Sequence, residues 1–279
     1  VEPPGDETRW THPPFAAEVA DEIGGGTIYG RGAVDMKGGV AAFTAAAIAK
    51  AKAGFTGTLS FAITGDEEGP AINGTAKLLA WAQQNGQRFD AALVGEPTSQ
   101  AKLGDTIKSG RRGSLSGTVT VSGKQGHVAY PQLADNPMPS LAKVLAKLTT
   151  LTLDEGSASF QPSNLEVTAV DTANQAFNVI PGEAKARFNV RFNDRWTIPA
   201  LKAHLKKEIL AVADGRAAVN FEPGSDWFVT EPGRLLDTLA DAIRAVTGVT
   251  PTPSTGGGTS DARFFKEICP VVEFGLVGD

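Results

Sequence analysis

Segments of helix and strand type alternate in the first hundred residues, and this alternation constrains the fold more than any other feature of the chain. We predict helices over 36–54 and 74–85, and strands over 57–64 and 90–95. Strands that alternate with helices form βαβ units and a mainly parallel sheet. The sequence therefore predicts an α/β domain.

The pattern changes near residue 113. From there we predict strands at 115–122, 164–170, 184–192 and 216–221, with helices at 137–150 and 197–212. The order β-α-β-β-α-β is typical of a ferredoxin-like α+β domain. A helix at 233–246 and a strand at 270–277 follow it. We therefore expect a lid or dimerisation domain of 113–225, inserted into a discontinuous catalytic domain of 1–112 and 226–279.

The overall composition excludes some classes of function. A net charge of −5 over 279 residues gives no electrostatic reason to bind nucleic acid or an anionic membrane. No apolar stretch is long enough to span a bilayer. Cys269 is alone, which excludes an internal disulfide and suits a reducing cytoplasm. Because the chain begins at Val1 and stops just after a strand-like run, we expect a piece of a longer protein.

Acidic residues gather where predicted strands end. Asp66, Glu67 and Glu68 stand side by side in TGDEEGP, Glu96 lies in VGEPT, and Asp35 precedes a predicted helix in GRGAVDMKGG. A single such acid is most often a helix cap or a solvated turn residue, and we interpret Asp66 in this way. Polar residues beyond the carboxyl ends of parallel strands line a ligand crevice, and several clustered carboxylates there most often neutralise a metal.

Five motifs in order carry a family resemblance over essentially the whole chain: GRGAVDMKGG, TGDEEGPAINGT, VGEPT, GKQGHVAYP and FNVIPGEAKARFNVRF. Together they resemble the desuccinylases of the zinc-dependent aminoacylase and carboxypeptidase superfamily. The resemblance implies amide hydrolysis: the removal of succinate from N-succinyl-LL-2,6-diaminopimelate, a step of lysine biosynthesis.

The resemblance also implies roles for the acids. Asp35 would bridge two zinc ions per subunit, with Co²⁺ as a possible substitute. Glu96 would be a further ligand of one ion, and Glu68 of the other. Glu67 would be the general base that takes a proton from the attacking water. The peptide bond between Asp35 and Met36 would be cis.

The family pattern has one histidine ligand per metal, and this chain departs from it. Those histidines would precede residue 1 and follow residue 279, and His12, His127 and His204 do not occupy matching positions. We therefore expect the chain as given to fold but to be inactive, with a metal site that is empty or loosely filled.

The resemblance further implies a homodimer in which His127 reaches the partner subunit's active site and hydrogen-bonds the oxyanion. By itself, a loop histidine is most often a surface residue. The residues implied to hold substrate carboxylates are Lys108, Arg111, Ser114, Tyr130, Asn178, Arg191, Gly258 and Thr259. From the residues alone, IKSGRRGS is either a solvated basic turn or an anion pocket.

Three alternatives remain open. The chain is a related deacylase such as an acetylornithine deacetylase, a metallopeptidase, or a non-catalytic relic or dimerising binding module. A basic acyl pocket favours a succinyl over an acetyl group, because only the succinyl group carries a carboxylate.

Overall fold

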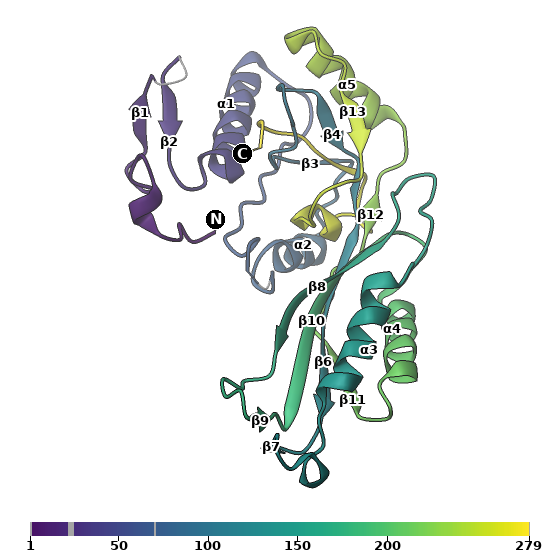
Figure 1. Ribbon diagram of the computed structural model, residues 1–279. Coiled ribbons are helices and arrows are strands. Elements are labelled where there is room, and N and C mark those ends of the chain that lie inside the picture. Colours follow the sequence, from purple (N-terminus) through teal and green to yellow (C-terminus); the bar gives the residue numbers. More distant parts are fainter. Residues whose placement is uncertain (1, 22–24, 70, 279) are drawn as a thin grey trace. The chain divides into compact units, whose positions relative to one another are not determined.

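The computed structural model describes residues 2–21, 25–69 and 71–278, and the chain divides into two compact units (Figure 1). Unit 1 comprises Val1–Gly110, Val229–Ser254 and Ser260–Asp279. Unit 2 comprises Arg111–Phe228 and the short segment Thr255–Thr259. The short strands β5 (Gly110–Arg111) and β12 (Phe228–Val229) each span a boundary between the units.

Unit 1 is built on a four-stranded sheet in the order β13-β4-β14-β3. Its strands are β3 (Ala92–Val94), β4 (Thr106–Lys108), β13 (Thr252–Ser254) and β14 (Val271–Glu273). The pairs β14–β3 and β13–β4 are parallel, and β14–β4 is antiparallel. The sheet is therefore mainly parallel, as the sequence predicts.

Three helices accompany this sheet: α1 (Gly38–Ala53), α2 (Thr75–Gln84) and α5 (Arg234–Thr247). Leu236 and Ile243 of α5 pack against Ile107 and Val272 of the sheet, so α5 closes an apolar core. The remaining elements of unit 1 are η1 (Glu7–Arg9), the hairpin of β1 (Glu18–Ala20) with β2 (Thr27–Tyr29), η2 (Ala33–Lys37) and η4 (Asp261–Phe264).

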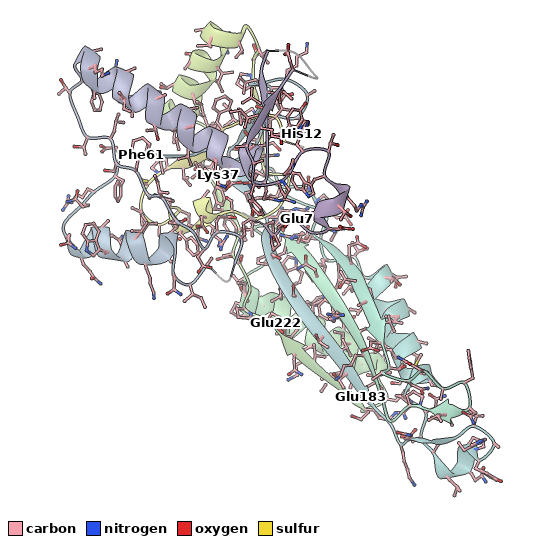
Figure 2. All side chains as sticks on the ribbon, turned by 90° about the vertical axis from the view of Figure 1, so that its left-hand side faces the viewer. Glu7, His12, Lys37, Phe61, Glu183 and Glu222 are labelled. Carbon is pink, nitrogen blue, oxygen red and sulfur yellow. The ribbon has the colours of Figure 1, made fainter. Side chains whose placement is uncertain are left out.

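The predicted strand at 57–64 is wrong. The structure has no strand there, and Leu59, Phe61 and Ile63 are exposed (Figure 2 labels Phe61). Their alternation with small polar residues has the period of a strand. A strand also needs a neighbour that takes up its backbone hydrogen bonds, and no described strand pairs with this segment.

Unit 2 is a four-stranded antiparallel sheet in the order β11-β6-β10-β8. Its strands are β6 (Gly113–Ser122), β8 (Asn164–Asp171), β10 (Glu183–Phe192) and β11 (Ala217–Phe221), and its helices are α3 (Met138–Thr150) and α4 (Ile198–Val212). The chain order β6-α3-β8-β10-α4-β11 confirms the predicted β-α-β-β-α-β arrangement. The short elements β7 (Gly126–His127), η3 (Pro131–Leu133) and β9 (Val179–Ile180) complete unit 2.

One face of this sheet is the core of unit 2. Leu115, Phe188 and Phe192 of the strands pack with Leu141 of α3 and Leu205 of α4, and all five are almost completely buried. Because side chains alternate along a strand, the other face carries polar residues. We call this polar face the open face of the sheet.

A partly exposed carboxylate fixes the segment that leads into β8. Asp154 accepts hydrogen bonds from the backbone of Gly156 (2.8 Å) and Ser163 (3.1 Å), from Asn193 Nδ2 (2.6 Å) and from Trp196 Nε1 (2.9 Å). Burial raises the pKa of this carboxyl, but hydrogen bonds to the ionised form outweigh that effect and leave its pKa lowered. The same segment presents the Pro162 carbonyl to Arg112 at 3.2 Å.

Within the described residues, no helix combines the length and apolar character that crossing a membrane requires.

Candidate active site

The first predicted acid, Asp35, lies in unit 1 just before α1. Its peptide bond to Met36 is cis, as the resemblance implies. The start of α1 touches the end of β3: a β-carbon at Gly39 would lie 2.6 Å from the carbonyl oxygen of Gly95. Only glycine permits this approach, which brings the segment after Asp35 against the residue that precedes Glu96. Glu96 itself is buried.

The second group of acids lies in the turn after the extended segment. Asp66 Oδ2 accepts a hydrogen bond from the backbone of Asn73 at 2.8 Å, so Asp66 stabilises the turn as expected. The turn leaves Glu67 half-buried and Glu68 exposed. Two adjacent glutamates thus have different environments, which suits different roles.

Glu67 lies in a strongly negative environment. Its pKa is raised to about 7, mainly by burial and further by the carboxylates of Asp261, Glu68 and Asp35, with the charge of Arg263 opposing them. The pKa of Glu68 is raised by burial and then by Asp35. These acids from distant parts of the sequence therefore share one electrostatic field. A carboxyl with a pKa near neutrality can both take up and release a proton, as general acid–base catalysis requires.

The sequence analysis missed Asp261 and Arg263. Asp261 is 6% exposed, and its Oδ2 accepts a hydrogen bond from Thr75 Oγ1 at 2.7 Å. Arg263 Nη2 lies 3.6 Å from Asp261 Oδ1, and Arg263 Nη1 donates to the Ser260 carbonyl at 2.8 Å. The signal was present in STGGGTSDARF, where an acid and an arginine follow Gly258 and Thr259, which we assigned to substrate binding.

Unit 2 brings one set of predicted substrate residues together at one end of its sheet. Ser114 of β6 lies directly opposite Arg191 of β10. Arg111 Nη1 donates to the carbonyl of Gly258 at 3.1 Å, and Thr259 follows in the same short segment. Lys108 lies in unit 1, where it is buried on β4 and its Nζ donates to Ser254 Oγ at 3.2 Å.

A second set gathers around β7 and β9. His127 Nε2 lies 3.5 Å from Asn178 Nδ2, and the rings of His127 and Tyr130 are 6.0 Å apart. His127 Nδ1 accepts a hydrogen bond from the backbone of Ala129 at 3.0 Å, which fixes the ring. All three predicted side chains, His127, Tyr130 and Asn178, are exposed.

The two sets lie at opposite ends of the sheet in unit 2. Figure 1 shows β7 and β9 beyond one end of β6 and β10, close to where β10 begins at Glu183 (labelled in Figure 2). Arg191 is near the other end of β10. At a rise of about 3.3 Å per residue, Glu183 and Arg191 are about 26 Å apart along β10. Within one copy of unit 2, His127 and Arg191 therefore cannot both contact the same small substrate.

Comparison with known proteins decides the family, because the profile of peptidase family M20/M25/M40 matches residues 1–279. The chain belongs to this family.

Similar M20 relatives include proteins named succinyl-diaminopimelate desuccinylase. One from Methylocella silvestris is 56% identical over 284 aligned residues, which cover 100% of this chain and 72% of the relative. One from Xanthobacter autotrophicus is 55% identical over 282 residues, covering 100% and 73%.

Solved M20-type structures confirm the predicted fold class. The metallo-carboxypeptidase Sso-CP2 from Sulfolobus solfataricus aligns with a TM-score of 0.74 at 17% identity, over 98% of this chain and 74% of that one. The di-peptidase Dug1p from Saccharomyces cerevisiae aligns with a TM-score of 0.70 at 18% identity, over 99% and 70%. At such low identity the likeness concerns the fold.

Membership of this metallohydrolase family implies a metal cofactor. Among the described residues, no group of three or more histidine, cysteine, aspartate or glutamate side chains is arranged so that it could hold a metal ion. The chemistry of the acids nevertheless fits a divalent cation. Carboxylate oxygens are the donors that hard cations prefer. A cation would relieve the repulsion that, in addition to burial, raises the pKa values of Glu67 and Glu68.

The shared field predicts pKa changes of opposite sign in the metal-free chain. Asp261→Asn should lower the pKa of Glu67, because it removes a negative neighbour and so favours the ionised carboxyl. Arg263→Gln should raise it, because it removes the opposing positive charge. The measurement is a pH titration of the Glu67 side-chain carboxyl by ¹³C NMR. Asp90→Asn is the matched control, and shifts of the same sign in both variants would contradict this assignment.

Proposed function

We propose that this chain is the hydrolytic part of a succinyl-diaminopimelate desuccinylase. It cleaves the amide of N-succinyl-LL-2,6-diaminopimelate with water and gives succinate and LL-2,6-diaminopimelate, a step of lysine biosynthesis in the cytoplasm. The observation that carries this proposal is identity above one half, over the whole chain, to relatives of that name. The acid cluster of unit 1 supports it independently of the names.

Glu67 performs the proton transfers in this proposal. Its carboxylate takes a proton from the attacking water and then delivers it to the departing amine. Burial of the side chain limits competition by solvent.

Asp35, Glu68 and Glu96 would hold two zinc ions, with Asp35 shared between them and Co²⁺ as a possible substitute. When bound, such a metal pair supplies Lewis acidity and makes water easier to deprotonate. The different exposures of Glu67 and Glu68 support the division between a proton carrier and a ligand.

The substrate's carboxylates would be bound by Arg111, Ser114 and Arg191, together with Lys108, Gly258 and Thr259. Guanidinium groups bind carboxylates through paired hydrogen bonds, which gives a succinyl group an advantage over an acetyl group. The insert of 113–225 would act as lid and dimerisation domain on a catalytic domain of 1–112 and 226–279.

The proposed active unit is a homodimer. His127, with Tyr130 and Asn178 beside it, would reach the active site of the second subunit and hydrogen-bond the oxyanion. These residues lie beyond the end of β10 at which Glu183 stands, about 26 Å along the strand from Arg191. This supports the proposal, because contributions to one site must then come from two copies.

Substitution of the neighbouring residues Glu67 and Glu68 tests the proposed function. Glu67→Ala should lower kcat for succinate release at least about a hundredfold while the zinc content is kept, because it removes only the proton carrier. Glu68→Ala should lower both activity and zinc content. Both are measured with the succinyl substrate and with N-acetylornithine in a protein of the relatives' full length, and the chain as given, which we expect to be inactive, is assayed beside it.

Two results would count against the proposal. Equal zinc loss in both variants would mean that base and ligand are assigned wrongly. Faster turnover of N-acetylornithine than of the succinyl substrate by the full-length protein would instead identify an acetyl-specific deacylase.

The action of His127 across the dimer is tested by subunit mixing. Glu67→Ala and His127→Ala homodimers should each be nearly inactive, since every site lacks one group. Random exchange makes half of the dimers mixed, and each mixed dimer contains one complete site. Activity should therefore recover to about a quarter of that of the unsubstituted full-length protein. No recovery, with exchange verified by mass spectrometry, would place His127 in its own subunit's site.

A further inference from the structure

The open face of the unit 2 sheet contains a hydrogen-bonded group that the proposed function leaves unused. Asn189 Nδ2 donates to Ser114 Oγ at 3.1 Å and to Ser116 Oγ at 3.0 Å. Ser116 lies directly opposite Asn189, and Ser114 lies on the diagonal beside it. An amide nitrogen only donates, so both serine oxygens act as acceptors here.

This arrangement leaves the Ser114 hydroxyl proton available. A serine hydroxyl can donate one hydrogen bond and accept two. Within the described part of the chain, Ser114 Oγ donates to no carbonyl or carboxylate. The hydroxyl can therefore donate a hydrogen bond to an acceptor that lies over the open face of the sheet.

The neighbours of Ser114 favour an anionic acceptor. Arg191 is directly opposite Ser114 and, within the described residues, makes no hydrogen bond or ion pair. Arg112 is buried, with its Nη1 bound to the carbonyl of Pro162 and to Asn164 Oδ1 (2.7 Å). Burial lowers the pKa of both guanidinium groups, and Arg191 lowers that of Arg112 further, while the carboxylate of Asp154 opposes the shift at Arg112. Two such cations side by side favour an anion between them.

Glu166, an acid on this face, does not fill that place. Glu166 lies opposite Asn189 on β8, and its Oε1 accepts from Asn164 Nδ2 at 3.4 Å rather than from either arginine. A carboxylate can only accept hydrogen bonds, so it matches both Arg191 and the free Ser114 proton.

We propose that Asn189 is a positioning residue, which holds Ser114 Oγ as an acceptor so that the hydroxyl proton points toward a substrate carboxylate bound by Arg191. This inference rests on the proposed function, in which Ser114 and Arg191 bind a carboxylate. Asn189 itself does not touch the ligand. Asp at this position would accept the Ser114 proton and repel the carboxylate.

The test is a titration of the ¹⁵N-labelled full chain with succinate, followed by NMR at Arg191 Nε and at the Asn189 side-chain amide. Asn189→Ala should weaken succinate binding roughly fivefold, the value of about one hydrogen bond. Asn189→Asp, which has nearly the same shape, should weaken it by about tenfold or more. Ser116→Ala is the matched control, and its affinity should stay within about twofold, since the Asn189–Ser114 bond remains.

A double-mutant cycle separates positioning from a merely structural role. If Asn189 acts through Ser114, Asn189→Ala has no further effect on succinate affinity in a Ser114→Ala background. Equal weakening in both backgrounds would overturn the inference, as would unchanged binding by Asn189→Asp. Absence of succinate binding in the unsubstituted chain is a different result, which would contradict the carboxylate site and the proposed function with it.

Discussion

Repulsion among carboxylates is the constraint on which the site in unit 1 depends. Glu67 is half-buried and has Asp35, Glu68 and Asp261 in its field, so its pKa rises to about 7. The fold holds these distant segments together by specific contacts: the approach of Gly39 to Gly95, and the hydrogen bond from Thr75 to Asp261. Like charges that are held together at a free-energy cost are typical of functional sites. There, a bound cation or a proton relieves the repulsion between them.

The sheet of unit 2 acts as a fixed spacer between two sets of polar residues. Its helix-covered face is a continuous apolar core, so the long strands β6 and β10 keep His127 and Arg191 apart. Its open face is free for polar chemistry, and there Asn189 links two serines beside Arg191. The same alternation of side chains that builds the core therefore also builds the face on which we propose that a carboxylate binds.

The helices and the long strands of both units could be predicted because their periodicity is strong and local; α3, α4, α5 and β10 lie where the sequence places them. The segment 57–64 could not, since a strand depends on a partner that local pattern does not specify. The motif resemblance identified Glu67 and its neighbours. It did not reveal Asp261 or Asn189, whose roles arise from contacts between residues far apart in the chain.

The central claim is that a divalent cation relieves the repulsion in the acid cluster, and proton release on metal binding tests it most directly. Because Glu67 has a pKa of about 7, it is partly protonated at neutral pH and must lose that proton when a cation binds beside it. Calorimetric titration with Zn²⁺ at pH 7, repeated in buffers of different ionisation enthalpy, counts the protons released. The account predicts release at pH 7 that falls strongly by pH 8.5 and is reduced in Glu67→Gln. Zinc binding with no release at pH 7, or with release unchanged in Glu67→Gln, would contradict it.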